Sequence, residues 1–275
     1  MSQNDLVFIR NLYLDLLKRA LTNWNHGHEE FIKVELDLVG KLLGKTELPS
    51  GSILIKPCRF DEKKRTYGQD WPVPIQAHTM VGMKRLNNLQ YCIEQVVVDN
   101  VPGDFIETGV WRGGCTIFMR GALNIFGDKD RCVWVADSFQ GLPPPNPEQY
   151  PADNGDIHHT ISSLCISEEA VRENFAAYGL LDEKVRFLKG WFKNTLPDAP
   201  IDKLSILRLD GDMYESTMDA LHNLYGKLSV GGFIIVDDYC IDSCRLAITD
   251  FRATHNIRDE IIDIDGSGVF WRRTC

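Results

Sequence analysis

The chain has 275 residues, of which 44% are hydrophobic and 25% are charged. This balance is typical of a globular protein that buries a sizeable core. The formal net charge of −9 argues against nonspecific binding to nucleic acid or to anionic membranes. The length suits one large α/β domain or two small domains.

Targeting segments and disulfides are not indicated. The opening Met-Ser-Gln-Asn-Asp lacks the basic start and apolar core of a signal peptide. No apolar run approaches the ~20 residues that span a bilayer. The eight cysteines are scattered without a Cys-x-x-Cys pair, and several lie in apolar runs, as reduced core cysteines do. We therefore expect a cytoplasmic protein with free thiols and no membrane or nucleic-acid partner.

The first hundred residues predict helices around an irregular stretch. Apolar positions at helical spacing predict a helix over 4–22, and residues 29–44 predict a second helix. An irregular segment with two prolines and large aromatic residues follows Pro49 and runs through 65–74, where a lid, an interface arm and plain loop packing all remain open. A further helix is predicted over 79–99.

From residue 104 onward the pattern alternates between strand and helix. A proline-rich loop at 142–151 interrupts it and cannot be regular structure. The alternation predicts a parallel, doubly wound sheet. The strands are expected at 104–110, 131–137, 185–189, 204–210 and 232–237, the helices at 114–126, 167–178, 215–228 and 241–255, and a final antiparallel pair at 259–265 and 268–272.

Acidic residues follow two of these predicted strands. Asp210 and Asp212 end Leu-Ser-Ile-Leu-Arg-Leu-Asp-Gly-Asp, and Asp237 and Asp238 end Gly-Gly-Phe-Ile-Ile-Val-Asp-Asp. In an open α/β sheet, ligand chemistry collects beyond the carboxyl ends of the strands. Carboxylates held close together repel one another unless a cation or a shared proton lies between them. The pattern predicts a divalent-ion site with something reactive beside it, although helix capping by Asp237 and Asp238 remains an alternative.

The first predicted strand leads into a glycine-rich turn, Phe-Ile-Glu-Thr-Gly-Val-Trp-Arg-Gly-Gly. Glycine lets the backbone turn sharply and lets a ligand approach the main chain. The turn is neither Gly-x-Gly-x-x-Gly nor a phosphate loop. Asp137 ends the next strand, where an acid is placed to accept hydrogen bonds from ribose hydroxyls. Together the turn and Asp137 favour a nucleoside site.

Five ordered motifs now resemble one family. They are Glu-Thr-Gly-Val-Trp-Arg-Gly-Gly, Asp-Ser-Phe-x-Gly-Leu-Pro, Lys-Gly-Trp-Phe-Lys-Asn-Thr-Leu-Pro, Leu-Arg-Leu-Asp-Gly-Asp-Met-Tyr-Glu-Ser-Thr and Val-Asp-Asp-Tyr. This set resembles the macrocin O-methyltransferase (TylF) family over roughly residues 65–272. Members of that family depend on S-adenosylmethionine and Mg²⁺ and methylate sugar hydroxyls of antibiotics and related glycosides.

The resemblance implies which residues bind the cofactor, whose product is S-adenosylhomocysteine. A first group holds the methionine part, namely Glu107, Thr108, Gly109, Val110 and Trp111. A second group contacts the ribose and adenine, namely Asp137, Ser138, Phe139 and Trp191. A third group comes from segments that close over the cofactor, namely Thr79, Met80 and Ser163.

The same resemblance implies that Asp210, Asp237 and Asp238 bind the metal and that Asp212 is the general base. A neutral sugar hydroxyl is a weak nucleophile, so it needs a base and charge stabilisation. Mg²⁺ prefers oxygen ligands, and coordination of two vicinal hydroxyls would lower the pKa of the one that reacts. Asp212 as a loop residue or an extra metal ligand stays open, as do the roles of His158 and His159 in the loop after the prolines.

The implied fold is a Rossmann-like, seven-stranded, doubly wound α/β sheet with an antiparallel last strand pair. Residues 1–64 would form an N-terminal helical extension, and residues 65–275 the methyltransferase domain with lid segments near 60–80 and 142–165. A homo-oligomer, a dimer or higher, is expected. Three alternatives to the sugar O-methyltransferase remain: a metal-dependent enzyme acting on a catechol or other diol, an NAD-dependent oxidoreductase, and a nucleoside-binding module without catalysis.

Overall fold

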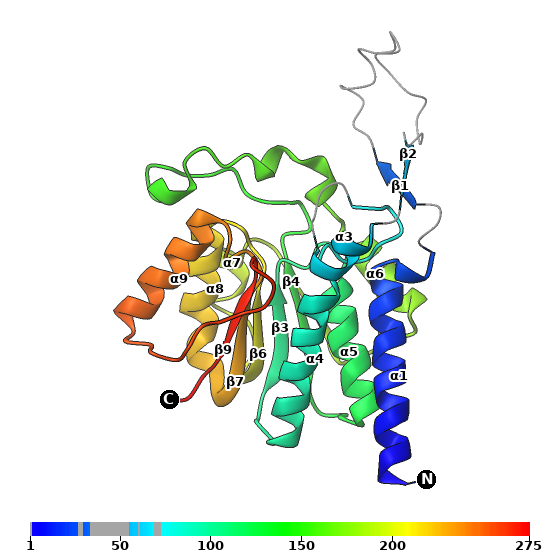
Figure 1. Cartoon of the computed structure of the whole chain (residues 1–275). Helices are drawn as coiled ribbons and strands as arrows, with labels where there is room; N and C mark the ends of the chain where they lie inside the picture. The colour runs from blue at the N-terminus through cyan, green and yellow to red at the C-terminus, as the bar shows by residue number, and fades with distance from the viewer. Residues whose placement is uncertain (1, 27–29, 34–54, 60, 69–72) are drawn as a thin grey trace.

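A computed structural model describes residues 2–26, 30–33, 55–59, 61–68 and 73–275. Its centre is a seven-stranded sheet with helices on both faces (Figure 1). The strands are β3 (Asp104–Thr108), β4 (Val133–Asp137), β5 (Val185–Lys189), β6 (Leu204–Leu209), β7 (Leu228–Val236), β8 (Ile262–Asp263) and β9 (Val269–Arg272). The strand–helix alternation predicted from residue 104 onward is confirmed.

The strand order is β5-β4-β3-β6-β7-β9-β8. Strands β3 to β7 pair in parallel, whereas β9 pairs antiparallel with both β7 and β8. The antiparallel last pair is therefore confirmed. The chain moves outward from β3 through β5 and then returns to place β6 on the other side of β3. This reversal creates a topological switch point between β3 and β6, where ligands collect in open α/β sheets.

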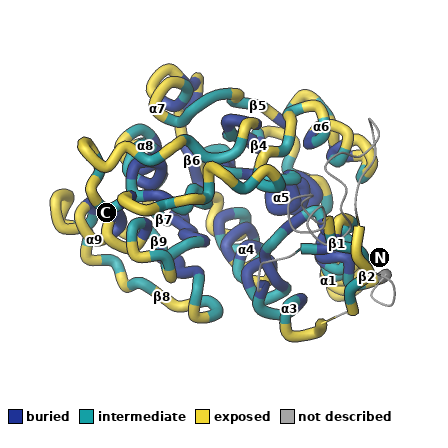
Figure 2. The backbone as a smooth tube through the Cα atoms, turned by 90° about the horizontal axis from the view of Figure 1, so that it is seen from above, coloured by how far each residue is buried: buried dark blue, intermediate teal, exposed yellow. Residues whose placement is uncertain are grey.

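Alternate side chains of the central strands enter two separate cores. Phe105 of β3 belongs to the cluster under one helix layer, whereas Ile106 belongs to the cluster under the other. This division follows from the period of two in a strand. The first layer contains α1 (Gln3–Leu21), α4 (Met83–Val98), α5 (Gly114–Phe126) and α6 (Glu168–Ala177), and the second contains α7 (Phe192–Thr195), α8 (Tyr214–Leu224) and α9 (Asp242–Thr254). The buried residues lie mainly in the strands and on the inner sides of these helices, and the exposed residues lie on the outer surface (Figure 2).

The predicted helix over 29–44 is wrong at its start. Residues 30–33 form strand β1 (Glu30–Lys33), which pairs antiparallel with β2 (Ile55–Cys58), and residues 34–44 lie outside the described part. The pairing partner lies more than twenty residues along the chain, so local periodicity cannot reveal it. The 65–74 stretch also contains more order than predicted, because α3 (Glu62–Tyr67) extends into it and ends at Gly68 with a positive φ.

Several boundaries differ modestly from the predicted ones. Helix α4 begins at Met83 rather than at residue 79, and α8 ends at Leu224 before a short 3-10 turn, η5 (Tyr225–Lys227). The proline-rich loop has no regular structure until the 3-10 turns η2 (Pro151–Asp153), η3 (His158–Thr160) and η4 (Ser162–Leu164). A further turn, η1 (Trp24–His26), follows α1. Within the described ranges, every helix is too short or too polar to cross a membrane.

Candidate active site

The turn after β3 lies directly against the turn after β6. The N–H of Asp210 donates to the carbonyl oxygen of Thr108 at 2.9 Å, and the N–H of Gly109 donates to Ala136 of β4 at 2.8 Å. Gly109 has a φ of +88°, a backbone conformation that glycine adopts at no steric cost. These contacts place the glycine-rich turn at the switch point. Helix α5 starts directly after it, at Gly114.

Asp137 organises this turn from the neighbouring strand. One carboxylate oxygen accepts the N–H of Val110 at 2.8 Å, and the other accepts the N–H of Phe139 at 2.7 Å. Burial raises the pKa of Asp137, and these backbone hydrogen bonds oppose the rise. Each carboxylate oxygen has a second lone pair, so Asp137 can hold the turn and still accept a hydrogen bond from a ligand.

The acidic residues predicted at the strand ends meet at one point. Carboxylate oxygens of Asp210, Asp237 and Asp238 all lie within 4.8 Å of one another. Asp212 follows two residues after Asp210 with a φ of +58°, and its N–H donates to Asp238 Oδ2 at 3.1 Å. The four aspartates therefore form one cluster at the carboxyl ends of β6 and β7.

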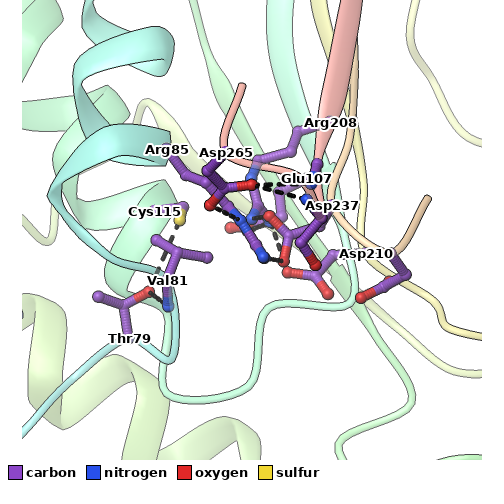
Figure 3. A network of polar contacts seen from close by, with 12 residues as sticks. Thr79, Val81, Arg85, Glu107, Cys115, Arg208, Asp210, Asp237 and Asp265 are labelled. Atoms are coloured by element: carbon purple, nitrogen blue, oxygen red, sulfur yellow. Dashed lines mark hydrogen bonds and ion pairs between the residues drawn. The ribbon is translucent and has the colours of Figure 1, made fainter. Parts of the chain in front are cut away.

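Two buried arginines form ion pairs with aspartates of the cluster (Figure 3). Arg208, on β6, pairs with Glu107, Asp237 and Asp210, reaching Asp210 Oδ2 at 2.6 Å. Arg85, on α4, donates to Asp237 Oδ2 at 2.5 Å. The carboxylate of Asp237 is thus held on both oxygens, and its orientation is fixed.

Asp265 completes the network on the far side of Arg85. Its Oδ2 accepts from Arg85 Nε at 2.8 Å, and its Oδ1 accepts the N–H groups of Ser267 and Gly268 at 3.1 and 3.0 Å. The chain of contacts runs from the β8–β9 turn through α4 to the ends of β6 and β7 (Figure 3). Such a network fixes the positions of its members because each buried charge has a partner.

Negative charge nevertheless exceeds positive charge in this cluster. Burial and the charge of Asp237 raise the pKa of Asp210 to about 7, against the lowering effect of Arg208. Burial, together with Asp212 and Asp210, raises the pKa of Asp238 well above its usual range. Burial also raises the pKa of Glu107 to about 8. Carboxylates in this state are suited to bind a cation, which would replace the missing positive charge.

A cavity of about 400 Å³ opens beside the cluster. This volume falls within the range of small-molecule sites. Of the residues predicted to form the site, those that line the cavity are Met80, Gly109, Trp111, Asp137, Ser138, Trp191, Asp210 and Asp212. Further lining comes from Gly141 and the proline-rich loop after it, from η4 and from α8, namely Gly141, Leu142, Pro143, Pro144, Leu164, Glu215, Ser216 and Asp219.

The other predicted residues are not among those that line the cavity. Phe139 is buried and packs near Phe187 at a ring-centroid distance of 6.1 Å. Glu107 is buried against Arg208, and its Oε2 has no hydrogen-bond partner. Asp237 and Asp238 lie next to the lining residues Asp210 and Asp212. The remaining four take part in hydrogen bonds near the glycine-rich turn, namely Thr79, Thr108, Val110 and Ser163.

Hydrogen bonds attach the segment predicted as a lid over 142–165 to the rest of the domain. Asp153 accepts the N–H groups of Tyr214 and Glu215 at 2.6 and 3.0 Å, which caps the start of α8. The indole Nε1 of Trp111 donates to the carbonyl oxygen of Ser163 at 2.9 Å. This segment is therefore held by the start of α8 on one side and by the glycine-rich turn on the other.

The two histidines of this segment have different surroundings: burial lowers the pKa of His158, but the hydrogen bond with Asp156 and the charge of Asp212 outweigh it and raise that pKa. His158 Nδ1 lies 2.6 Å from Asp156 Oδ2, and His159 is exposed. Tyr214 donates its hydroxyl to Asp250 at 3.1 Å. His222 lies exposed on α8. None of these four is among the described residues that line the cavity.

Arg85 and Arg208 are the residues that sequence reasoning missed. Arg208 had a signal, because a charged residue inside the buried run Leu-Ser-Ile-Leu-Arg-Leu requires a buried partner. Arg85 had a weaker signal as a charged position on the buried face of α4. Its partner Asp237 is 152 residues away in sequence, so no motif could connect the two.

Comparison with known proteins identifies the family of this chain. The model of the macrocin O-methyltransferase (TylF) family matches residues 10–273. This chain belongs to that family. It is an O-methyltransferase, and the family predicted from the five motifs is confirmed.

Two curated relatives show how close this O-methyltransferase is to characterised members. The 8-demethyl-8-(2,3-dimethoxy-alpha-L-rhamnosyl)-tetracenomycin-C 4'-O-methyltransferase of Streptomyces olivaceus is 50% identical over 267 residues, covering 97% of this chain and 94% of the relative. The mycinamicin III 3''-O-methyltransferase of Micromonospora griseorubida is 48% identical over 267 residues, covering 96% of this chain and 97% of the relative.

A solved structure supports the fold of this O-methyltransferase. The O-methyltransferase NovP superposes with a TM-score of 0.83 at 47% sequence identity, covering 97% of this chain and 100% of NovP. The predicted Rossmann-like methyltransferase fold with its N-terminal helix is confirmed.

Proposed function

We propose that this enzyme transfers a methyl group from S-adenosylmethionine to a sugar hydroxyl of a glycosylated natural product, with Mg²⁺ at the aspartate cluster. The observation that carries the proposal is the meeting of Asp210, Asp237 and Asp238 within 4.8 Å beside a cavity that Asp212 lines. One relative acts on a rhamnosyl tetracenomycin and the other on mycinamicin III. Both names support a glycosylated natural product as the acceptor class.

The glycine-rich turn and the end of β4 would hold the cofactor. Gly109, Trp111, Asp137 and Ser138 line the cavity at the switch point, and Trp191 lines it from the segment after β5. Asp137 would accept a hydrogen bond from a ribose hydroxyl, and the indole of Trp191 offers a flat apolar surface for a base. When bound, the cofactor supplies an electrophilic methyl group on a sulfonium.

The predicted metal ligands fit a divalent cation. Asp210 and Asp238 carry raised pKa values because of burial and mutual repulsion, and a hard cation with oxygen ligands would remove that repulsion. Arg85 and Arg208 already occupy one position on each oxygen of Asp237, and the remaining lone pairs can bind an ion. When bound, Mg²⁺ supplies positive charge that lowers the pKa of a nearby acceptor hydroxyl.

Asp212 would act as the general base. It lies at the cavity wall, two residues after Asp210, and Asp238 holds its backbone N–H. The positive φ of +58° turns the chain sharply at this residue. We propose that Asp212 would accept the proton of the acceptor hydroxyl and so raise the nucleophilicity of that oxygen. Positioning of that oxygen by the cavity walls supplies further acceleration.

A methyl-transfer assay with purified protein tests this function. Labelled S-adenosylmethionine would be incubated with glycosylated natural products and with catechols, each with EDTA or with added Mg²⁺. We expect glycosides to gain one methyl group, no transfer with EDTA, and recovery with Mg²⁺. Methylation of catechols alone would favour the diol enzyme. Binding of NAD in place of S-adenosylmethionine would refute the methyl-transfer proposal.

The Asp212→Asn variant tests the base. We expect turnover to fall by about 10² to 10⁴, the usual contribution of a general base. Calorimetry should show unchanged binding of S-adenosylmethionine. Binding of Mg²⁺ should be retained because its three proposed ligands remain. Normal turnover would mean that another group accepts the proton. Loss of Mg²⁺ binding would instead make Asp212 a metal ligand.

A further inference from the structure

The glycine-rich turn contains an arginine, Arg112, that the proposed function does not use. It is not among the described residues that line the cavity. It lies between Trp111 and Gly113, whose φ values are +48° and +85°. Its carbonyl oxygen accepts a hydrogen bond from the side chain of Asn174 on α6 at 3.0 Å. The backbone of Arg112 is therefore fixed to a helix, which sets where its side chain can reach.

The guanidinium of Arg112 holds a stretch of backbone from another part of the chain. Its Nη1 donates to the carbonyl oxygens of Pro74, Ile75 and Ala77 at 3.0, 3.1 and 2.6 Å. Burial lowers the pKa of Arg112 to about 10, so the side chain is still a cation at neutral pH. Hydrogen bonds from a charged donor are stronger than those between neutral groups. Arg112 therefore ties residues 74–77 to the glycine-rich turn.

The same guanidinium stacks on a side chain that lines the cavity. Arg112 Cζ lies 4.1 Å from the centroid of the Trp111 ring, within the distance of a cation–π contact. Trp111 lines the cavity, and its indole N–H donates to the carbonyl oxygen of Ser163. The face of the indole is thus held by Arg112 and its N–H by the 142–165 segment. Together these two contacts fix how the ring lies in the cavity wall.

The backbone that Arg112 binds leads to a second lining residue, Met80. On the way it lies closely against α5, because a Cβ atom on Gly114 would lie 2.5 Å from the carbonyl oxygen of His78. Thr79 Oγ1 lies 3.8 Å from the Sγ atom of Cys115 on the same helix (Figure 3). Met80 follows Thr79 directly, so a displacement of residues 74–77 would also move Met80.

We propose that Arg112 is a positioning residue for the cofactor: it fixes Trp111 and Met80 relative to each other, so that the cavity fits S-adenosylmethionine before the cofactor binds. The role assigned to Arg112 rests on the proposed function, because it requires the cofactor to occupy the cavity that these two residues line. Walls that are already ordered lower the free-energy cost of binding. The contacts of Arg112 with carbonyl oxygens and Trp111 include no aspartate of the cluster, so the effect falls on cofactor binding rather than on proton transfer.

Calorimetry with S-adenosylhomocysteine tests this role. Arg112→Met keeps an unbranched apolar chain but removes the cation and its donors. We expect the Kd to rise by about tenfold, the effect of losing one hydrogen bond or cation–π contact. An unchanged Kd would overturn the proposal for Arg112 alone. Failure of the wild-type protein to bind S-adenosylhomocysteine would instead refute the proposed function, and the role of Arg112 with it.

Arg273→Met is the matched control, because Arg273 makes the same kinds of contact away from the cavity. Its Nη1 donates to the carbonyl oxygens of Tyr225 and Leu228 at 3.0 and 2.5 Å, and its Cζ lies 5.0 Å from the centroid of the Tyr225 ring. Leu228 begins β7, at the end of the sheet opposite to the cavity. Arg273→Met should therefore lower stability without changing the Kd. An equal rise in Kd for both variants would make Arg112 a general stabilising contact and overturn the proposal.

Kinetics and a conservative variant separate positioning from folding. Arg112→Met should raise the KM for S-adenosylmethionine with little change in kcat, as expected when binding in the ground state and in the transition state weaken equally. A lower kcat at an unchanged KM would contradict this role. Arg112→Lys keeps the charge but not the planar fork, so its Kd should lie between those of wild type and Arg112→Met. It remains a test where Arg112→Met does not fold, and a wild-type Kd in Arg112→Lys would show that the guanidinium is not required.

Hydrogen exchange of the ligand-free protein tests the link between Arg112 and Met80 directly. We expect faster exchange over residues 75–81 in Arg112→Met, because the carbonyl oxygens of this segment lose their charged donor. Arg273→Met should exchange there like wild type. Unchanged exchange in Arg112→Met would overturn the proposal, since the segment would then be held without Arg112. This measurement uses no cofactor, so its outcome is separate from that of the methyl-transfer assay.

Discussion

A Cβ atom on Gly109 would lie 1.7 Å from the carbonyl oxygen of Asp210. The backbone after β3 therefore touches the backbone after β6 with no room for a side chain. One of these residues belongs to the proposed cofactor turn and the other to the proposed metal ligands. A displacement at either one is transmitted to the other through this direct contact.

We predict that Gly109→Ala loses both stability and activity. The φ of +88° disfavours alanine, and the added methyl group must push Asp210 away. We expect turnover to fall by about 100-fold or more, the effect of an ångström-scale misplacement. Gly127→Ala is the control, because Gly127 has a φ of +75° with nothing within 4 Å of the added atom. It should cost only about 1 kcal/mol in urea unfolding. Equal behaviour of the two variants would show that the contact with Asp210 is unimportant.

A second prediction concerns Arg208. The variant Arg208→Met keeps much of the apolar bulk but leaves the carboxylates of Glu107, Asp210 and Asp237 without this cation. We expect a loss of about 3–5 kcal/mol in the free energy of unfolding, as for other buried charges left unpaired. Arg186→Met changes the same residue type on the exposed side of β5 and should change stability by less than about 0.5 kcal/mol.

A double variant separates the charge of Arg208 from its packing. Glu107→Gln removes one of the carboxylates that Arg208 neutralises, so we expect part of the lost stability to return in the Arg208→Met, Glu107→Gln protein. Strictly additive losses in this cycle would show that packing, rather than charge, explains the cost of losing Arg208.

The part of the fold that the sequence reveals is the part with local signals. Mostly apolar runs in β3, β4, β6 and β7 lead directly to Gly109, Asp137, Asp210 and Asp237. The longer helices α8 and α9 each bury one apolar side. The rule that parallel strands share a carboxyl edge then brings Asp210 and Asp237 together. Each strand pattern and the aspartate that follows it lie within a few residues of each other in the sequence. Neither therefore required knowledge of distant contacts.

The remainder depends on contacts that no local pattern encodes. The pairing of β1 with β2 joins segments separated by more than twenty residues. Arg85 acquires its role only because α4 packs beside β7, which Asp237 directly follows. A basic residue on an amphipathic helix is usually solvated, so its contact with an aspartate on another element could not be inferred from periodicity.

A third prediction concerns the link between Trp111 and the lid. Trp111→Phe keeps an aromatic ring but removes the indole N–H that donates to Ser163 at 2.9 Å. We expect faster hydrogen exchange over residues 157–165 and a higher KM for the acceptor. Ser163→Ala is the control, because the bond uses the backbone carbonyl oxygen and should survive. Faster exchange in Ser163→Ala alone would assign the contact to its hydroxyl instead.

A fourth prediction concerns pH and Mg²⁺. The pKa of Asp210 is raised to about 7 and that of Glu107 to about 8 in the folded protein. Between the usual carboxyl pKa near 4 and these values, the folded state binds more protons than the unfolded state. The free energy of unfolding of the metal-free protein should therefore fall as pH rises from about 5 to about 8.

Mg²⁺ should reverse this trend, because it replaces protons at the cluster. We expect scanning calorimetry to show a larger Mg²⁺-induced rise in Tm near pH 8 than near pH 6, since at the lower pH the ion must displace protons from the carboxyl groups. In Asp238→Asn the Mg²⁺ effect should be small at both pH values, because one proposed ligand has lost its charge. An equal Mg²⁺ effect at the two pH values would argue that the ion binds elsewhere. A pH-dependent effect that survives in Asp238→Asn would instead exclude this aspartate as a ligand.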